Sequence, residues 1–395
     1  MKRNHVNQNS VHGLMCAVVL LALAAGCAGC NAPGTEEKVP EKSDSIAIMT
    51  WNVQALFDGV DEGTEYDEYR GSADWTTEKY RGRLNIIAGA IGTMERKPDI
   101  IALQEIESAQ VTADLAAALS AQGYGWTHFA HIPGMSLGVG LLSRYPLTGA
   151  RSHSVNIDGD IAPRPMLEVR INTAAHASGD ETGAGGSSLA LFVCHWKSKL
   201  GSEEATERTR RASARIILRR LIELKKTDPD LPVIIMGDLN ENHDEFYRRS
   251  GTTISALLPD DPRAAELANL YGLDGNDPDI AAIIGERQKD FIVLSKGKPP
   301  ETRYFPAGVL TLYSPWAAEL HDGSYYYKND WETIDHFLLS PQLFNGTGWD
   351  FENCEVVNSP PFVSAKGFPV AYNPRTGSGL SDHLPLLLLL KMRGQ

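Results

Sequence analysis

Short apolar runs alternate along the chain with segments in which apolar residues recur every three or four positions. The runs contain few polar residues, which is typical of strands buried on both faces of a sheet. We predict strands at residues 46–51, 99–103, 138–143, 166–171, 189–194, 231–236, 333–339 and 384–390. The leucine run Leu386–Leu390 is too short to cross a membrane, so a core strand is expected there.

The periodic segments between these runs predict helices. Tyr80 and Ile91 lie at the two ends of one apolar face, and Thr76 or Thr77 is expected to cap the helix that carries it. Pro98 is expected to end this helix. Two further helices are predicted, over residues 111–119 and 203–226.

Strands and helices alternate without a linker in the middle of the chain. The polar stretch 58–74 predicts an exposed loop, and the glycine- and serine-rich stretch 174–188 predicts a mobile one. We therefore predict one α/β domain over residues 46–392, with sheets inside and helices outside.

The N-terminus is typical of a lipoprotein signal. Lys2 and Arg3 precede the apolar run Leu14–Ala25, which is shorter than a comfortable transmembrane helix. The ending Ala24-Ala25-Gly26-Cys27 resembles the bacterial lipobox, whose cysteine is lipidated. We expect a signal peptide over 1–26, lipidation at Cys27 and a flexible tether over 27–45, which would place the domain on the periplasmic or outer side of the envelope. Cys30 is a second lipidation candidate, and a simply cleaved signal or an uncleaved anchor is the alternative.

The formal net charge of -13 argues against a tight, nonspecific duplex binder. It does not exclude nuclease chemistry, because bound cations offset negative charge locally. Cys16, Cys194 and Cys354 show neither a pairing pattern nor metal-ligand spacing, and Cys194 is expected to be a small core residue.

Polar strings lie at the ends of most of the predicted strands. They contain Asn52, Glu105, His195, Asp238 with Asn240, Asp335 with His336, and Asp382 with His383. Side chains at strand ends tend to converge at one rim of a sheet. Carboxylates, amides and imidazoles gathered there, without a cysteine cluster, suit a hard cation and a phosphate ester.

Each string also has a structural interpretation. An isolated Asn52 is a turn residue about as often as a ligand, and the Asp238–Asn240 pair could form an Asx turn. A lone His195 after an apolar strand is more often a hydrogen-bonding residue than a catalyst. His336 is either a neighbour of the site or a strand residue that faces away from it.

Taken in order, these strings resemble the endonuclease/exonuclease/phosphatase superfamily, which has the deoxyribonuclease I-like fold. The resemblance spans roughly residues 46–391 and rests on Trp-Asn, Gln-Glu, Ser-Arg-Tyr-Pro, His-Trp-Lys-Ser-Lys, Gly-Asp-Leu-Asn, Ile-Asp-His and Ser-Asp-His-Leu-Pro. It implies an α/β fold of four layers (α/β/β/α), in which two packed mixed sheets are flanked by helices.

The resemblance also implies roles for individual residues. Asn52, Glu105 and Asp382 match the metal site, which would hold Mg²⁺ or Mn²⁺. Asp238 matches the residue that activates the attacking water, and Asn240 the residue that holds the water or the phosphate. His383 matches the group that stabilises the transition state, and Asp335 the carboxylate that braces it. His195 matches a second catalytic histidine of some branches, and its carboxylate partner cannot be identified in the sequence.

Other implied assignments concern the substrate. Arg164 falls where relatives often carry a phosphate-facing arginine, although an exposed structural arginine is the alternative. Gln54 stands where some apurinic-endonuclease relatives have an acidic residue, which disfavours that branch. The segment 241–333 includes Tyr325–Tyr327, for which ordinary strand packing is the favoured interpretation over substrate contact.

We therefore expect a monomeric, metal-dependent phosphoester hydrolase, with extracellular nucleic acid as the leading substrate. A sphingomyelinase or a phosphoinositide-type phosphatase is the enzymatic alternative. A non-catalytic envelope lipoprotein that uses the cleft for binding is the alternative of another class. The retention of all the site residues argues against it.

Overall fold

A computed structural model describes residues 44–157, 160–162, 164–173, 188–271, 290–297, 303–305, 309–318, 320 and 322–394. The predicted signal peptide, Cys27, Cys30 and nearly all of the predicted tether lie outside the described residues, as does most of the 174–188 stretch. Within the described part of the chain, no helix is long and apolar enough to cross a membrane.

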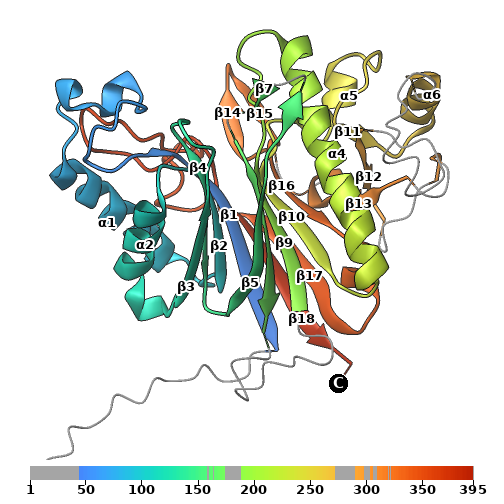
Figure 1. The fold of residues 1–395 in the computed structure, drawn as a ribbon, viewed down its shortest axis with the longest axis horizontal. Coiled ribbons are helices and arrows are strands. Elements are labelled where there is room, and N and C mark those ends of the chain that lie inside the picture. The colour runs from blue at the N-terminus through green and yellow to red at the C-terminus, as the bar shows by residue number, and fades with distance from the viewer. Residues whose placement is uncertain are drawn as a thin grey trace, which may run out of the picture. The chain divides into compact units, whose positions relative to one another are not determined.

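Two mixed β-sheets form the centre of the domain (Figure 1). The six-stranded first sheet has the order β17 (Gly348–Val356), β18 (Leu386–Arg393), β1 (Ser45–Leu56), β2 (Ile100–Ile106), β4 (Gly138–Ser143) and β3 (Trp126–Ala130). The eight-stranded second sheet has the order β11 (Leu257–Pro259), β12 (Ile292–Ser295), β13 (Thr311–Tyr313), β16 (Asp335–Leu339), β10 (Val233–Asp238), β9 (Ser188–His195), β8 (Met166–Asn172) and β5 (Leu147–His153).

Each sheet has the same arrangement of strands around its own central strand, β1 in the first sheet and β10 in the second. In the first sheet β1 is parallel to β2 and antiparallel to β18. In the second sheet β10 is parallel to β9 and antiparallel to β16. Because β1 contacts β10 across the interface between the sheets, the ends of the two central strands lie close together.

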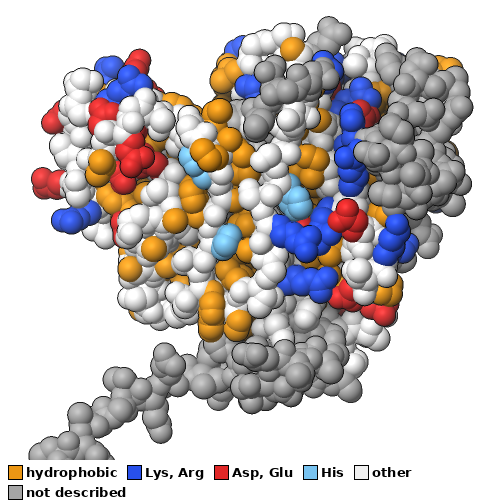
Figure 2. Space-filling view, viewed as in Figure 1, with side chains coloured by type: hydrophobic (Ala, Val, Ile, Leu, Met, Phe, Trp, Pro, Cys, Tyr) orange, Lys and Arg blue, Asp and Glu red, His pale blue; other side chains and the backbone are white. Residues whose placement is uncertain are grey.

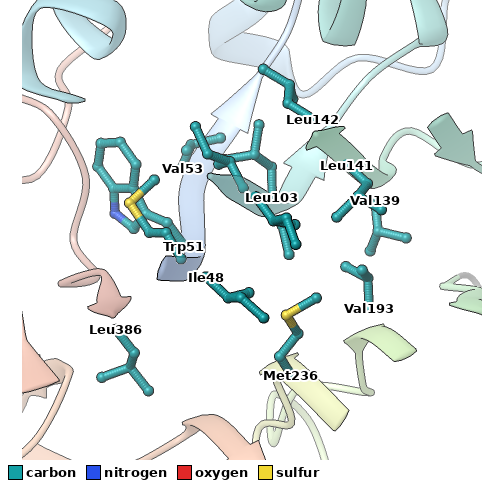
Figure 3. Close-up of a cluster of buried hydrophobic side chains, with 14 of the residues drawn as sticks. Ile48, Trp51, Val53, Leu103, Val139, Leu141, Leu142, Val193, Met236 and Leu386 are labelled. Atoms are coloured by element: carbon teal, nitrogen blue, oxygen red, sulfur yellow. The ribbon is translucent and has the colours of Figure 1, made fainter. Parts of the chain in front are cut away.

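The inner faces of the sheets form the main hydrophobic core. Val193 and Met236 from the second sheet meet Ile48 and Leu103 from the first in one buried cluster (Figure 3). These side chains come from continuous apolar runs, so each strand can bury one face between the sheets and the other beneath a helix.

Helices cover the outer faces of both sheets (Figure 1). α1 (Thr77–Thr93) and α2 (Ala109–Ala118) pack on the first sheet, and α4 (Glu203–Thr227) packs on the second. The Thr76 side chain accepts a hydrogen bond from Lys79 N, so the predicted cap is present. α1 ends at Thr93, earlier than the expected stop at Pro98, because Met94 already has non-helical backbone angles.

The segment 241–333 extends the second sheet. It supplies β11, β12 and β13, together with the short helices α5 (Glu245–Arg248) and α6 (Pro262–Tyr271). It also forms a separate hairpin of β14 (Tyr325–Tyr327) and β15 (Asp330–Glu332). A second small hairpin joins β6 (Asn156–Ile157) to β7 (Asp160–Ile161). The single turns of 3-10 helix are η1 (Asp67–Tyr69), η2 (Gly71–Ala73), η3 (Ser120–Gln122), η4 (Pro315–Ala318) and η5 (Pro341–Phe344).

The prediction of an exposed loop over 58–74 is only partly correct. The stretch contains the turns η1 and η2, and it buries Glu65 and Tyr69. Glu65 accepts hydrogen bonds from Glu62 N and Gly63 N at 2.7 Å, which offsets the cost of removing its carboxylate from water. The polar composition of this stretch therefore did not reveal that the loop is ordered and that Tyr69 packs into the main core.

Charge is unevenly distributed on the surface. On the face shown in Figure 2, Lys and Arg side chains gather over α4, whereas Asp and Glu are conspicuous around the turns that precede α1. Several arginines of α4 pair with acidic neighbours, such as Arg211 and Arg215 with Asp290. The negative net charge of the chain thus coexists with a locally basic helix.

Candidate active site

The ends of β1 and β10 bring Asn52 and Asp238 into contact. Asn52 Nδ2 donates a hydrogen bond to Asp238 Oδ2 at 3.0 Å and lies 3.4 Å from Glu105 Oε1. Asn52 Oδ1 accepts a hydrogen bond from Gln54 N at 3.0 Å, which fixes the orientation of the amide. In this arrangement Asn52 links two carboxylates through its nitrogen.

Glu105 enters the site through an irregularity in β2. Its backbone has φ 65°, and the pairing of β2 with β4 shifts register between Gln104 and Ile106. Gln104 instead faces the core and bonds Thr50 Oγ1 at 3.2 Å. A left-handed backbone is costly for a residue other than glycine, and such costs concentrate at functional sites. The bulge therefore turns the Glu105 carboxylate toward the rim, where its side chain is 18% exposed.

His383 and Asp335 form a buried ion pair. His383 Nδ1 lies 2.8 Å from Asp335 Oδ2, which also accepts a hydrogen bond from Ser324 Oγ at 2.6 Å. Burial disfavours the charged imidazole, but the charge of Asp335 and its hydrogen bond outweigh this effect and raise the pKa of His383 to about 10. His383 is therefore an imidazolium at neutral pH.

His195 is in the opposite state. Burial lowers its pKa well below the ordinary value, and the positive charges of Arg164 and His383 lower it further. Its Nε2 lies 3.4 Å from Asp238 Oδ2 and 3.8 Å from Glu105 Oε1. The carboxylate neighbours that the sequence could not identify are thus Asp238 and Glu105. The site combines one neutral and one cationic imidazole.

Asp238 lies between these groups. Burial raises its pKa, and the nearby negative charge of Asp335 raises it further, whereas His383 and Arg164 lower it. Asp238 Oδ1 accepts a hydrogen bond from Asn240 N at 2.9 Å, so the Asx turn considered from the sequence is present. This turn aims the other carboxylate oxygen, Oδ2, toward Asn52 and His195.

Asn240 and Arg164 meet at one backbone carbonyl. Asn240 Nδ2 donates to Trp196 O at 3.1 Å, and Arg164 Nη1 donates to the same oxygen at 2.8 Å. The Arg164 guanidinium also interacts with the hydroxyl of Tyr66 and offsets part of the pKa rise that burial gives this tyrosine. The structure places Arg164 beside the site, half-buried, rather than on the open surface.

Tyr66 was missed in the sequence. It belongs to the loop that was expected to be exposed, and the negative charge of Glu105 contributes to its raised pKa. Its side chain is 39% exposed. The sequence signal for a role of Tyr66 was weak: an aromatic residue within an acidic, polar stretch.

Asp382 reaches the rim on the segment before β18. Gln54 Oε1 accepts hydrogen bonds from Asp382 N at 3.2 Å and Tyr372 N at 2.7 Å, so the side chain that departs from the family pattern positions this segment. Burial raises the pKa of Asp382, and the neighbouring charge of Glu105 adds to the rise, while His383 opposes it. Ser381 Oγ donates to Asn52 O at 2.7 Å and ties the segment to the end of β1.

Tyr325 is a second residue whose role was missed. Its ring stacks on the His383 ring with centroids 4.5 Å apart and an angle of 27° between the planes. The strand packing expected for Tyr325–Tyr327 is present in β14, and for Tyr325 it includes this contact with the site. The face of an aromatic ring attracts a cation, so this contact also favours the imidazolium.

The chemistry of the donor set fits a hard divalent cation. Asp238, Asp335 and His383 place three potential ligand atoms within 4.8 Å of one another. A histidine held as an imidazolium cannot ligate a metal, because ligation requires the neutral ring. The oxygens of Glu105 and Asp382 are the better candidates. The negative charge of Glu105 raises the pKa of Asp382, and a cation between them would relieve this repulsion.

Two residues named in the sequence lie outside the reacting groups. His336 is buried, and its Nε2 bonds Glu241 O at 2.8 Å, so it is the strand residue that faces away. Cys194 is a buried free cysteine in the cluster between α4 and the second sheet, as predicted.

A model of the Endonuclease/Exonuclease/phosphatase family matches residues 46–272, more than half of the chain. The chain therefore belongs to this family, and the four-layer fold predicted from the resemblance is confirmed. The enzymes in the name of the family hydrolyse phosphoester bonds, which assigns the chain to the phosphoester hydrolases. No curated protein sequence matches it significantly.

Several solved structures are similar to the chain at low identity. TDP2 from Caenorhabditis elegans is 13% identical, with 88% of this chain and 74% of that chain covered and a TM-score of 0.47. The human Nocturnin catalytic domain with bound sulfate is 16% identical, with 88% and 93% covered and a TM-score of 0.47. A mannosyl-6-phosphatase from Bacteroides thetaiotaomicron is 14% identical, with 87% and 99% covered and a TM-score of 0.44. At identities and TM-scores this low, these likenesses carry no argument about the substrate.

Proposed function

We propose that this member of the endonuclease/exonuclease/phosphatase family is a divalent-metal-dependent phosphodiesterase that cleaves nucleic acid outside the cytoplasm. The observation that carries the proposal is the convergence of Asp238 with the buried His195 and with the His383–Asp335 ion pair. Asp335 holds His383 cationic, whereas burial holds His195 neutral. An anionic phosphoryl group and an attacking water need these two kinds of partner.

Asp238 is the group that takes a proton from water in this mechanism. A general base works best when its pKa lies near the working pH, and burial beside Asp335 shifts the Asp238 pKa upward in that direction. Asn52 and His195 hold its Oδ2, and the Asx turn with Asn240 holds its Oδ1. The carboxylate is therefore oriented before substrate arrives.

His383 stabilises the negative charge that develops on the phosphoryl oxygens. Its Nδ1 is bonded to Asp335, which leaves the Nε2–H free to donate toward the rim. The neutral His195 lies with its Nε2 beside Asp238 Oδ2 and adds no second positive charge to the site. Arg164, held by Trp196 O, supplies a further positive charge beside the site.

The carboxylates of Glu105 and Asp382 would hold Mg²⁺ or Mn²⁺, with Asn52 nearby. When bound, such an ion polarises a phosphoryl oxygen and stabilises the leaving group. The Glu105 side chain, which is 18% exposed, keeps the metal position accessible to solvent and substrate.

The envelope location is proposed from the sequence alone. A lipid at Cys27 would hold the domain at the membrane, where extracellular nucleic acid is within reach. Labelling of the full chain with radioactive palmitate tests this, with Cys27→Ala and Cys30→Ala as paired variants. We expect only Cys27→Ala to lose the label, and labelling of neither cysteine would contradict the anchor.

The enzymatic test is a substrate panel of DNA, RNA, sphingomyelin and phosphoinositide, each with Mg²⁺ and with EDTA. We expect Mg²⁺-dependent cleavage of nucleic acid, and nearly complete loss of it in Asp238→Ala and His383→Ala with the fold retained. His128→Ala, an exposed histidine on β3, is the control and should behave as wild type. Cleavage of lipid alone would assign the site to the sphingomyelinase or phosphoinositide class. No hydrolysis of any substrate would favour the binding lipoprotein.

A further inference from the structure

The hairpin of β14 and β15 leads from the site toward the surface. Tyr325 forms an isolated antiparallel bridge with His383, and Leu384 N donates a hydrogen bond to Ser324 O at 2.7 Å. Ser324 Oγ also bonds Asp335. The hydrogen bonds that surround the His383–Asp335 pair therefore fix the position of the hairpin.

Aromatic rings continue the stack outward from His383. The ring of Tyr325 stacks on His383, and the ring of Tyr327 stacks on Tyr325 with centroids 6.0 Å apart and planes 18° apart. Tyr327 is 43% exposed, which makes it one of the few large hydrophobic side chains of the described residues left open to solvent. The ammonium of Lys328 lies 5.0 Å from its ring centroid.

The turn of the hairpin carries backbone strain. Lys328 has φ 49° and Asn329 has φ 65°, as in a type I′ turn. Glycine or asparagine is favoured at both central positions, so lysine at the first is costly. An ordinary structural role gives no reason to keep a lysine there, whereas a function for its ammonium does.

The hairpin is held firmly from its other side. Arg248 donates to Asp330 Oδ2 at 3.0 Å and to Trp331 O at 3.1 Å. Tyr326, which points away from Tyr327, packs against Phe368 with centroids 4.3 Å apart. Tyr327 is therefore presented on a fixed support.

We infer that Tyr327 and Lys328 form a stacking platform for a nucleobase next to the scissile phosphate, and that the substrate class is single-stranded nucleic acid. The inference rests on the proposed function. An aromatic face accepts any base and a nearby ammonium accepts the backbone phosphate, which is the usual combination for single strands. In a duplex the base faces are already covered by their neighbours.

The lysine does not block the platform. A flexible ammonium over an exposed ring is held only weakly, whereas a base stacked on tyrosine gains more. A base can therefore displace Lys328 from the ring, and the released ammonium remains beside the strand to pair with phosphate.

The test compares two substrates of equal length, a single-stranded oligonucleotide and an oligomer of abasic residues, with Mg²⁺ and the full chain. In Tyr327→Ala we expect the ratio of kcat/KM values for the two substrates to fall roughly tenfold, the size of one lost base stack. Tyr327→Phe, which keeps the ring, should retain the wild-type ratio. Tyr304→Ala is the matched control. Tyr304 is similarly exposed, at 45%, and its backbone N bonds Asp260, which follows the edge strand β11.

A further variant separates function from folding. Lys328→Gly relaxes the turn, so we expect a higher Tm together with a lower kcat/KM on the oligonucleotide. A ratio unchanged in Tyr327→Ala, or equal losses on single-stranded and duplex DNA, would overturn the platform while leaving the proposed function intact. Failure of the wild-type chain to cleave either substrate would overturn both.

Discussion

The active site has two halves, the first carried by the first sheet and the second by the second sheet. A buried arginine supports each half. Arg83 projects from α1 and donates to the backbone oxygens of Val53, Gln54 and Ala55, just after Asn52. Its guanidinium also lies 3.8 Å from the ring centroid of Tyr372. No carboxylate of the described residues forms an ion pair with it.

Arg210 has the corresponding position in the second half, but it has acidic partners. It projects from α4, with Nε bonded to Glu241 Oε2 at 2.5 Å and Nη2 to Glu207 Oε2 at 2.8 Å. It also donates to Lys197 O at 3.2 Å. The network thus supports the segments that follow both β9 and β10.

The comparison shows two ways to hold a strained backbone beside a reactive site. Gln54 and Ala55 follow Asn52 with positive φ, and Asn240 has positive φ two residues after Asp238. Burial lowers the pKa of Arg83, whereas for Arg210 the charges of Glu241 and Glu207 outweigh burial and raise the pKa. The first half retains a buried positive charge that forms no ion pair with the described residues, whereas Arg210 in the second half is paired with Glu207 and Glu241.

Removal of Arg210 should have the largest effect on stability. Arg210→Met leaves the carboxylates of Glu241 and Glu207 buried without their main partner, and the free energy of unfolding should fall by about 3–5 kcal/mol. Urea denaturation measures this, with Arg208→Met on the exposed face of α4 as the control. The double variant Arg210→Met/Glu241→Gln should recover part of the loss. Equal stability of the single and double variants would mean that charge compensation is not the cause.

Glu168, a buried carboxylate of the second sheet that is paired with basic side chains, should make the stability of the fold sensitive to acid. Burial would raise the pKa of Glu168, but hydrogen bonds from His153 and Arg220 lower it from 4.5 to about 2. A depressed folded-state pKa stabilises the fold above pH 4.5, and this contribution is lost as the pH falls toward 2. We expect about 3 kcal/mol of the unfolding free energy to disappear over this range.

Unfolding measured as a function of pH checks this prediction. The wild-type chain should lose stability more steeply over this acid range than Glu168→Gln, which lacks the titrating group. Parallel curves for the two proteins would show that Glu168 is not the source.

Removal of Arg83 should have the smaller effect on stability and the larger effect on catalysis. Arg83→Met removes charged hydrogen bonds but also removes an uncompensated buried charge, so we expect a net loss of about 2 kcal/mol. Because Asn52 adjoins the carbonyls that Arg83 holds, kcat should fall at temperatures where the variant is still folded. Arg81→Met, on the exposed side of α1, is the control. A kcat equal to wild type would show that Arg83 supports the fold alone.

The sheet strands, and the convergence of the polar residues at their ends, could be predicted from the sequence because each signal is local. A run such as 231–236 can only be buried, and the polar residue at its end, Asp238, must emerge at the rim. The terminal leucine run was assigned to the core for the same reason, and β18 is an interior strand of the first sheet.

The supporting groups could not be predicted because their partners are distant in the chain. Arg83 lies three residues after Tyr80, on the apolar face of α1. This position indicates burial, but the periodicity does not show which groups an arginine there would contact. Tyr66 reaches the site on a loop and Tyr325 on the β14–β15 hairpin, and the position of both depends on tertiary contacts. The direction of the Glu105 side chain depends on a β-bulge, and no residue type in the sequence predicts that bulge.

The two halves of the site should act together in phosphoester hydrolysis. Glu105 and Asp382 of the first half bind a divalent cation, and Asp238 of the second half takes the proton from water. The most direct test is an anomalous difference map from crystals of the protein soaked in Mn²⁺. We predict a peak in contact with the carboxylate oxygens of Glu105 and Asp382, which disappears in Glu105→Gln. A peak elsewhere, or none under conditions that support hydrolysis, would contradict the account.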